Sequence, residues 1–258
     1  MSPTIVITGS TSGFGRALAL ELAGHGAHLV VAGRNETAAR EVARTIGENQ
    51  ALGMRYDARD ETSVAALWDA AINRFGRVDH WILNAGVGTS RGRLDELSVE
   101  EIRTAVDTNL VGALLGARHA LTGMLAQGRG RIWITEGLGS EGRTLAGTGV
   151  YSATKAAVTQ AFEVLALECK GTPLEVGFIR PGIMPTGLTQ SGDSDSTGFA
   201  ALQLRLLADS PEDVAREFAP RILAARGART RLTWLTPTRI AAHLLTRPLG
   251  SPSQPPSR

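Results

Sequence analysis

The chain lacks several features that would assign it to a special class of protein. Its 258 residues include a single cysteine, Cys169, which excludes an intramolecular disulfide and is typical of a reducing compartment. No apolar run reaches the roughly 18 residues that a membrane-spanning helix needs. The N-terminus has neither the basic segment nor the cleavage site of a secretory signal. These absences predict a soluble protein of the cytoplasm.

Concentrated charge of one sign is also absent. The formal net charge is +2, and basic and acidic residues alternate without a basic run, so we expect no nucleic-acid partner. The five histidines are scattered without the spacing of metal ligands, and we predict no metal site. Only two lysines occur, Lys155 and Lys170, so a lysine within a functional motif stands out against the many arginines.

Apolar runs alternate with segments of helical period along the whole chain. Strands are expected at 5–7, 29–32, 51–56, 81–83, 132–134, 174–179 and 232–235, with helices at 17–22, 36–46, 64–75, 102–125, 151–169 and 211–225. Buried strands that alternate with helices predict βαβ units. We therefore expect an α/β fold, a single doubly wound Rossmann-type domain at residues 1–250 with a parallel sheet of about seven strands. The Pro- and Ser-rich tail at 251–258 is expected to be disordered.

One polar segment interrupts this alternation after the sixth expected strand. Residues 187–198 are rich in Gly, Ser and Asp, and they lead into an apolar stretch. Because ligands of such sheets bind beyond the carboxyl ends of the strands, we expect a substrate lid at about 187–210. A surface insertion without function is the alternative. The apolar residues of the lid predict a partly apolar substrate, and they are Leu188, Phe199, Leu202 and Leu206.

A glycine-rich turn at Thr8–Gly15 joins the first expected strand to the first helix. Its glycines allow a phosphate to approach backbone N–H groups closely, and the helix N-terminus supplies partial positive charge. After the second strand, Arg34 stands where an acidic residue would bind a ribose 2′-OH, and its cation can pair with a 2′-phosphate. Ser10 and Thr11 are candidate hydroxyl donors to the same phosphate. These residues predict NADP(H) rather than NAD(H).

A tyrosine and a lysine four residues apart occur in Tyr151-Ser152-Ala153-Thr154-Lys155. With the glycine-rich turn and several shorter motifs in the same order and spacing, the chain resembles the short-chain dehydrogenase/reductase family over roughly Thr4 to Pro248. The resemblance implies an oxidoreductase that acts on a small molecule, without a membrane partner. In this family the helices expected at 102–125 and 151–169 often form a subunit interface, which suggests a homo-oligomer, a tetramer or dimer.

The resemblance also implies which residues bind the cofactor. They comprise the glycine-rich turn, the cation after the second strand, a contact to adenine and the Asn-Ala-Gly motif after the fourth strand. A lysine that holds the nicotinamide ribose and a turn that cradles the nicotinamide carboxamide complete the set. The residues are Gly9, Ser10, Thr11, Ser12, Gly13, Phe14, Gly15, Arg34, Asp57, Asn84, Ala85, Gly86, Lys155, Pro181, Gly182, Ile183 and Thr186.

For catalysis the resemblance implies that Tyr151 is the general acid in carbonyl reduction, or the base in alcohol oxidation. A free phenol has a pKa of about 10, which is too high for efficient proton transfer near neutral pH. Lys155, one helical turn later, shares a face with Tyr151 and, with an oxidised nicotinamide nearby, would lower that pKa. Asn109 would hold a water for proton relay, and the hydride comes from the cofactor.

The serine that completes such a site in the family is missing. Counting back thirteen residues from Tyr151 reaches Leu138, and counting along the preceding strand reaches Gly137, and neither side chain is a hydrogen-bond donor. Loss of one such donor costs a factor of about 10² to 10³ in rate, so we expect compensation. Glu136 could serve as an acid or bind an ammonium or iminium group, although ordinary loop roles for Ser140 and Glu136 stay open. The candidate donors are the side chains of Ser140, Thr135 and Glu136 and the backbone N–H groups of Gly137 and Leu138.

The altered site leaves three functions open. The first, which we favour, is an NADP-dependent reductase or dehydrogenase acting on a carbonyl or a related C=N or C=C bond. The second is a cyclase or isomerase that keeps Tyr151 and Lys155 but transfers no net hydride. The third is a catalytically weak NADP-binding protein, against which the intact Tyr151, Lys155 and Asn109 argue. By analogy, an altered site suggests a role in secondary metabolism.

Overall fold

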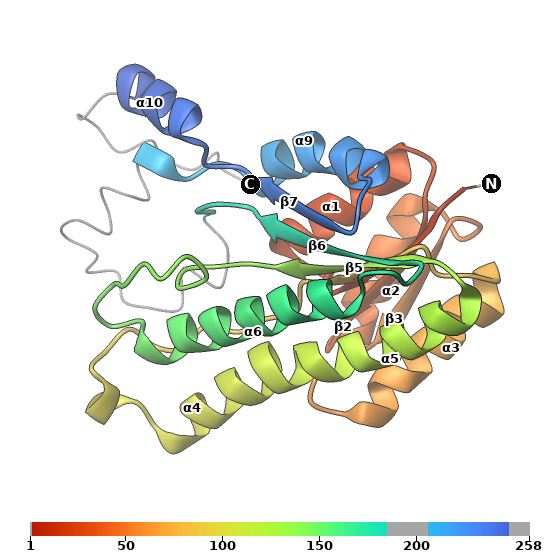
Figure 1. The fold of residues 1–258 in the computed structure, drawn as a ribbon, viewed down its shortest axis with the longest axis horizontal. Helices are drawn as coiled ribbons and strands as arrows, with labels where there is room; N and C mark the ends of the chain where they lie inside the picture. The colour runs from red at the N-terminus through yellow and green to blue at the C-terminus, as the bar shows by residue number, and fades with distance from the viewer. Residues whose placement is uncertain (1, 185–205, 248–258) are drawn as a thin grey trace.

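The structure is a computed structural model that describes residues 2–184 and 206–247. Within these residues, parallel strands form one seven-stranded sheet in the order β3-β2-β1-β4-β5-β6-β7 (Figure 1). The direction of strand addition reverses between β1 and β4, which is the topological switch point of a doubly wound sheet. The predicted α/β fold is confirmed. The strands are β1 (Thr4–Thr8), β2 (His28–Gly33), β3 (Ala51–Arg55), β4 (His80–Leu83), β5 (Gly130–Thr135), β6 (Leu174–Arg180) and β7 (Arg229–Thr233).

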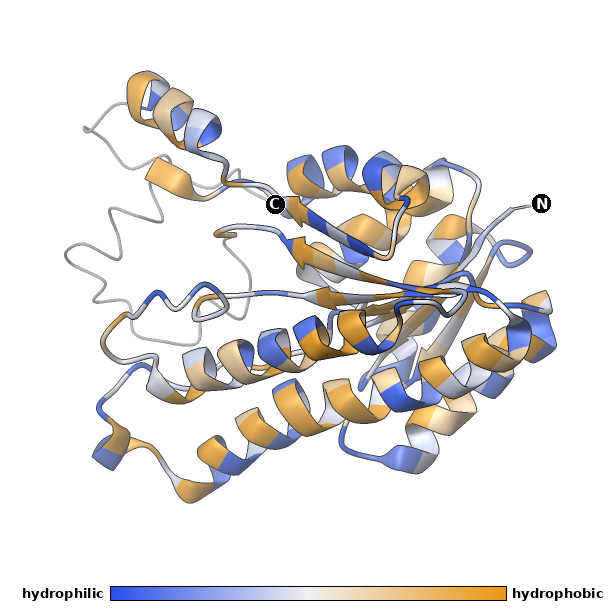
Figure 2. Ribbon diagram, in the orientation of Figure 1, coloured by the Kyte–Doolittle hydropathy of each residue, from blue (hydrophilic) through white to orange (hydrophobic). Residues whose placement is uncertain are grey.

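Helices cover both faces of the sheet, because alternate residues of the central strands are buried on opposite sides. In β1, Ile5 and Ile7 pack into one core while Val6 packs into the other, and none of the three is exposed. In Figure 2 the helices carry both apolar and hydrophilic residues, as helices with one face on a sheet do. The first core holds α1 (Gly13–Gly24), α2 (Glu36–Ile46) and α9 (Pro211–Ala224), and the second holds α3 (Glu61–Phe75), α5 (Gly112–Gln127) and α6 (Gly149–Glu168).

The long helix expected at 102–125 is interrupted by one turn of different geometry. It begins as α4 (Val99–Val106), continues as a π-helical turn at Asp107–Val111 and ends as α5. Gly112 follows the π turn and packs against Ala58, where an added Cβ would lie 2.6 Å from the Ala58 Cβ. Single π turns inside α-helices are frequent at functional sites.

The C-terminal part departs most from the prediction. The sequence predicts the last strand at 232–235, whereas β7 spans Arg229–Thr233. Only Leu232 is buried in this edge strand, so its other residues lack the apolar run by which the buried strands were located. A further helix, α10 (Pro237–Thr246), follows it and extends from the body of the molecule (Figure 1). The expected lid lies outside the described residues apart from 206–210, as do Leu188, Phe199 and Leu202. The tail at 251–258 also lies outside them. No helix in the described ranges is long and apolar enough to cross a membrane.

Candidate active site

The motifs found in the sequence meet at the carboxyl ends of β1, β4 and β5, beside the start of α6. An added Cβ at Gly9 would lie 2.7 Å from the Ala85 Cα, so the turns after β1 and β4 are in contact. One at Gly86 would lie 3.3 Å from Asn109 Oδ1 and 3.7 Å from Lys155 Nζ. The cofactor motifs and the Tyr151/Lys155 helix therefore surround one site at the topological switch point.

The glycine-rich turn has a backbone that other residues would not adopt. Gly9 and Gly13 have φ values of +66° and +53°, in the left-handed region that favours glycine. An added Cβ at Gly15 would lie 2.4 Å from the Gly9 carbonyl oxygen, so this position also requires glycine. Ser12 is the N-cap of α1 and makes no side-chain capping bond. The side chain of Phe14 is buried edge-on against Phe218 of α9, so Phe14 offers the site its backbone only.

Ser10 does not have the role that its hydroxyl suggested. It is completely buried, and its hydroxyl donates to the Ile7 carbonyl at 2.6 Å and accepts the Ala32 N–H at 2.9 Å. That hydroxyl joins the ends of β1 and β2 and is not free to donate to a 2′-phosphate, so this prediction is wrong. Thr11 packs against Gly33, at the end of β2.

Arg34 follows β2 as an exposed cation. It forms no ion pair with any other described residue. The nearby carboxylate of Asp57, after β3, is paired with Arg59 and not with Arg34. It accepts hydrogen bonds from Arg59 Nε at 3.1 Å and Arg59 Nη2 at 2.9 Å. The Arg59 hydrogen bond holds the pKa of the Asp57 carboxyl below its usual value, and the Arg34 charge acts in the same direction. The end of β2 thus presents a positive charge without a carboxylate of its own.

Asn84 ties the end of β4 to the glycine-rich turn. Its amide Nδ2 donates to the carbonyl oxygens of Thr8 at 3.2 Å and Gly9 at 3.0 Å. The Thr8 hydroxyl in turn accepts the N–H groups of Asn84 and Ala85, at 3.0 and 3.1 Å. The Asn-Ala-Gly motif therefore fixes the geometry of the turn through neutral hydrogen bonds.

Tyr151 and Lys155 lie on α6, where the Lys155 side chain is buried and Tyr151 is half-buried. Lys155 Nζ donates to the Thr135 carbonyl at 3.0 Å and lies 6.0 Å from the centre of the Tyr151 ring. Burial lowers the pKa of Lys155 to about 8, and the Glu136 charge opposes this shift. Burial raises the pKa of Tyr151 to about 12, opposite to the direction expected from the Lys155 charge. In the protein alone, Tyr151 is a protonated acid at neutral pH.

Asn109 lies in the π-helical turn and is almost completely buried. Its Oδ1 accepts the Val87 N–H at 2.8 Å, while its Nδ2 donates to the Val87 carbonyl at 2.8 Å and to the Thr154 hydroxyl at 3.1 Å. The side chain therefore joins the loop after β4 to the helix that carries Tyr151.

Of the two positions counted for the missing serine, Gly137 is the one that faces the Tyr151 hydroxyl. An added Cβ there would lie 2.5 Å from the Tyr151 hydroxyl, so the phenol takes the space in which a side chain would begin. Ser140 does not supply the missing donor. Its hydroxyl accepts the Gly137 N–H at 3.2 Å and the Thr159 hydroxyl at 2.9 Å, and it donates to the Lys155 carbonyl at 3.3 Å. A hydroxyl can donate one hydrogen bond and accept two, so the Ser140 hydroxyl has no donor left for a substrate. Its bonds join the loop after β5 to α6.

The other groups proposed to replace the serine hydroxyl also have partners within the protein, with one exception. The Thr135 hydroxyl donates to Asn84 Oδ1 at 3.3 Å. The Glu136 carboxylate is fully buried and paired with two arginines, so it is neither a solvated loop group nor open to a substrate. Among the described residues, the Leu138 N–H has no hydrogen-bond partner. This N–H is the one remaining candidate donor of the five.

The turn after β6 completes the edge of the site. Gly182 has a φ of +80°, and the Ile183 carbonyl accepts the Asp209 N–H at 3.1 Å. Ile183 also bridges to Ala208, which anchors the segment before α9. Pro181 is buried beside them, whereas Thr186 lies outside the described residues.

Comparison with known proteins places this chain in a family. The sequence model of the short chain dehydrogenases matches residues 3–197, and the chain belongs to that family. It is 36% identical over 219 residues to the cis-4-hydroxycyclohexanecarboxylate dehydrogenase of Sinomonas cyclohexanicum, with 83% of this chain and 86% of that protein covered. It is 32% identical over 262 residues to a probable chlorophyll(ide) b reductase of Oryza sativa subsp. japonica, with 94% of this chain covered. The chain spans about half the length of that protein and of its Arabidopsis thaliana counterpart.

A solved structure with the same fold holds a nicotinamide cofactor. An actinorhodin polyketide ketoreductase variant with NADPH matches with a TM-score of 0.78 and 28% sequence identity, covering 90% of this chain and 96% of that one. Family membership and this neighbour support an oxidoreductase with a nicotinamide cofactor.

Proposed function

We propose that this chain is an NADP(H)-dependent oxidoreductase that transfers a hydride to the carbonyl, or a related C=N or C=C bond, of a small, partly apolar organic substrate. The observation that carries the proposal is the protonated, half-buried Tyr151 beside the buried Lys155, at the edge where the glycine-rich turn and the Asn-Ala-Gly motif meet. A proton donor next to a dinucleotide cradle suits the reduction of a polar double bond.

The residues at this edge fit a dinucleotide. Gly9, Gly13 and Gly15 keep the turn free of side chains at the N-terminus of α1, where a pyrophosphate would be bound by N–H groups. Gly86 leaves room beside Lys155 for a ribose. The unpaired Arg34 supports a 2′-phosphate and hence NADP(H). When bound, the cofactor would supply the hydride.

The chain's own residues would manage the proton. As the hydride reaches the carbonyl carbon, the Tyr151 hydroxyl donates its proton to the substrate oxygen. Because an alkoxide is a stronger base than a phenolate, this transfer is favourable even from a phenol whose pKa is about 12. The Lys155 ammonium, oriented by the Thr135 carbonyl, stabilises the phenolate that forms. The Leu138 N–H takes the place of the missing serine as a second donor. Asn109 keeps the loop after β4 in register with α6 and stays a candidate to hold the relay water.

The substrate class can be tested with cyclic ketones, since a 36% identical relative is named for a ring alcohol. We would incubate the chain with 4-oxocyclohexanecarboxylate and other cyclic ketones, with NADPH or NADH, and quantify both cofactor and alcohol. We expect NADPH and alcohol to change in equal amounts, with NADPH preferred over NADH. Rearranged products without loss of NADPH would refute the proposal in favour of a cyclase or isomerase.

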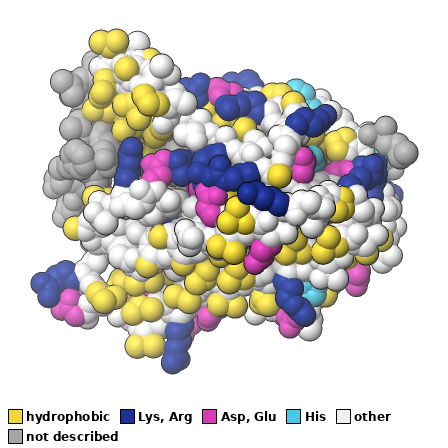
Figure 3. All heavy atoms as spheres, in the orientation of Figure 1, with side chains coloured by type: hydrophobic (Ala, Val, Ile, Leu, Met, Phe, Trp, Pro, Cys, Tyr) yellow, Lys and Arg dark blue, Asp and Glu magenta, His cyan; other side chains and the backbone are white. Residues whose placement is uncertain are grey.

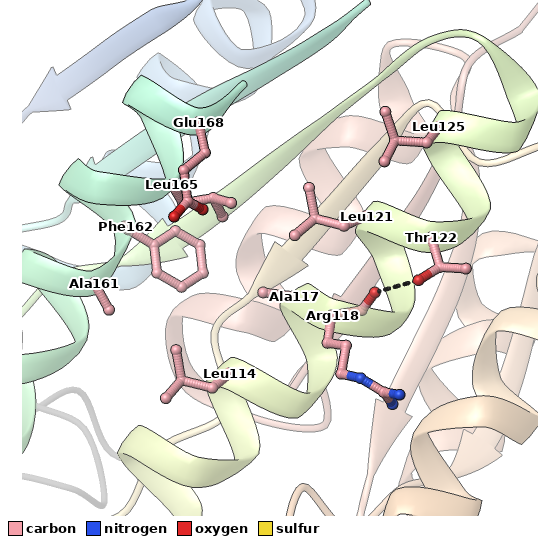
Figure 4. Close-up of a pocket in the computed structure, with 10 residues that line it drawn as sticks. All are labelled: Leu114, Ala117, Arg118, Leu121, Thr122, Leu125, Ala161, Phe162, Leu165 and Glu168. Atoms are coloured by element: carbon pink, nitrogen blue, oxygen red, sulfur yellow. Dashed lines mark hydrogen bonds between the residues drawn. The ribbon is translucent and has the colours of Figure 1, made fainter. Parts of the chain in front are cut away.

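A homo-oligomer is part of the proposal, with its interface on α5 and α6. Figure 3 shows apolar side chains gathered on the lower half of one face, over these helices. Leu114, Leu125 and Leu167 are 42%, 50% and 59% exposed there. A groove of about 310 Å³ lies between the two helices (Figure 4). Sedimentation of the chain and of a Leu114→Glu variant tests this, since a dimer or tetramer should dissociate when the charge is introduced.

We also propose a cytoplasmic location, which fits the free, buried Cys169.

A further inference from the structure

Seven charged side chains of alternating sign form a continuous ladder behind Tyr151 and Lys155. Figure 3 shows basic and acidic side chains mixed in a band across the middle of one face. The ladder begins in the loop after β5, crosses the ends of β6 and β5, and reaches α6 through β7. Its members in order are Arg143, Glu141, Arg180, Glu136, Arg231, Glu163 and Arg229.

The central member of the ladder is the one that water does not reach. The Glu136 side chain is 0% exposed, and it pairs with Arg180 Nε at 2.9 Å and Arg231 Nη2 at 3.0 Å. Exposure increases outward, to 46% at Arg229 and 72% at Arg143. Exposed ion pairs contribute little, whereas a buried pair becomes costly when one partner is lost. The ladder therefore depends on Glu136.

Glu136 lies between the two residues that touch the proposed catalytic pair. The carbonyl of Thr135 accepts the Lys155 ammonium, and Gly137 contacts the Tyr151 hydroxyl. The Glu136 N–H donates to the Ile179 carbonyl at 2.7 Å, so backbone and side chain are both fixed. Because Glu136 is bonded to both of these residues, a shift of its backbone would displace the carbonyl that accepts from Lys155 and the glycine beside Tyr151.

We propose that Glu136 is a positioning residue. Its carboxylate, clamped by Arg180 and Arg231, holds the peptide against which Tyr151 and Lys155 are aligned and keeps Lys155 in its charged form. This inference rests on the proposed function of Lys155, but its test does not require a substrate.

Within residues 2–184 and 206–247, few other charges face Lys155. On its own helix the titratable neighbour is Tyr151, and from the end of β5 it is Glu136, with Arg180 and Arg231 behind the carboxylate. The loop after β4 and the π-helical turn present Gly86 and the amide of Asn109, which are uncharged. Removal of the Glu136 charge should therefore make the Lys155 ammonium easier to deprotonate.

The test uses the fact that the chain has only two lysines. With [¹³C,¹⁵N]lysine incorporated, the Cε signals of Lys155 and the exposed Lys170 are followed against pH by NMR, in the wild type and in Glu136→Gln. We expect the Lys155 midpoint to fall by roughly one pH unit in the variant, a tenfold change in the ratio of ammonium to amine, while Lys170 stays unchanged. Should Glu136→Gln not fold, the double variant with Arg231→Gln removes one charge of each sign, and a smaller fall is expected because loss of the Arg231 cation favours the Lys155 ammonium.

Glu163→Gln is the matched control, because it breaks the same ladder at α6 without removing the buried carboxylate. We expect the Lys155 midpoint of this variant to match the wild type. An unchanged midpoint in a folded Glu136→Gln protein, or an equal fall in Glu163→Gln, would overturn the inference. A normal shift in a chain that reduces no ketone would instead count against the proposed function alone.

Discussion

The two halves of the site edge are held together by different kinds of interaction. At the ends of β1, β2 and β4, the neutral groups of Ser10, Thr8 and Asn84 bond to backbone atoms. At the ends of β5, β6 and β7, Glu136 and its arginine partners form a charged ladder. The first half is held by neutral hydrogen bonds, and the second half lies beside the buried Lys155 ammonium and the half-buried Tyr151 phenol.

This difference separates binding from proton chemistry. Because the hydrogen bonds of the first half are neutral, its backbone N–H groups and the Arg34 cation are the groups that can bind an anionic ligand. The first half should therefore control the affinity for the cofactor and the preference for NADPH over NADH. The proton affinities of Tyr151 and Lys155 respond to burial and to charge, so the second half should control rate and pH dependence.

The largest effect is expected from Tyr151→Phe, which removes the proposed proton donor. We predict a fall in kcat/KM of at least about 10³-fold, with NADPH affinity retained. Tyr56→Phe is the matched control, since Tyr56 is the only other tyrosine and lies buried in the hydrophobic core. Near wild-type turnover in Tyr151→Phe would remove Tyr151 from the mechanism.

Lys155→Met should change the pH dependence of stability. The pKa of Lys155 falls from 10.5 to about 8 in the folded protein, so between these pH values the unfolded chain binds more protons. Lys155 should therefore contribute a rise of about 3 kcal/mol in the free energy of unfolding across this window, while the raised pKa of Tyr151 acts in the opposite direction above pH 10. Urea unfolding at pH 7 and pH 10.5 measures the Lys155 contribution as the difference between the wild type and Lys155→Met, and the exposed Lys170→Met should behave as the wild type. A rise of equal size in Lys155→Met would assign it to another group.

Arg34→Ala tests the binding half. Loss of a charge-assisted contact worth about 1.5–3 kcal/mol should raise the Kd of NADPH by roughly 10- to 100-fold and leave that of NADH unchanged. Arg40→Ala is the control, because Arg40 is an arginine of the following helix α2 that already pairs with Glu36. Fluorescence titration with both cofactors gives the comparison, and an equal loss of affinity for NADH would contradict a 2′-phosphate contact.

Gly137→Ala is expected to have the smallest effect. Its methyl group would lie 2.5 Å from the Tyr151 hydroxyl, so the phenol must shift. We predict a fall in kcat of about tenfold, because small misplacements of reacting groups lower rates. Gly137→Ser adds the same β-carbon together with a hydroxyl. The ratio of kcat between the Ser and Ala variants therefore isolates the effect of a hydroxyl at this position. An Ala variant as fast as the wild type would show that the Gly137 contact is unimportant.

The sequence was sufficient for the architecture, because buried strands and helices have different periods. The helix expected at 36–46 matches α2 in both bounds, and its start is explained by the Asn35 cap, which accepts the Ala38 N–H. The π-helical turn was not predictable in the same way, since it shares the helical pattern of the segment around it.

The candidate site was predictable as a set of motifs, but the partners of its side chains were not. Ser140 looked free in sequence, yet its partners Gly137, Lys155 and Thr159 are brought to it by the packing of α6. Glu136 read as a loop residue because its pairing with Arg180 depends on the register of β5 and β6, in which Thr135 lies opposite Ile179. Such registers between distant segments are set by the folded sheet, not by local pattern.

The most direct test of the account is hydride transfer itself. The chain would be supplied with NADPH deuterated at the transferable position and with a cyclic ketone, and the product analysed by mass spectrometry and NMR. We predict one deuterium at the carbinol carbon for each NADPH consumed, and none from Tyr151→Phe under the same conditions. A product free of deuterium, formed while the cofactor stays unchanged, would contradict the assignment of this chain as a reductase.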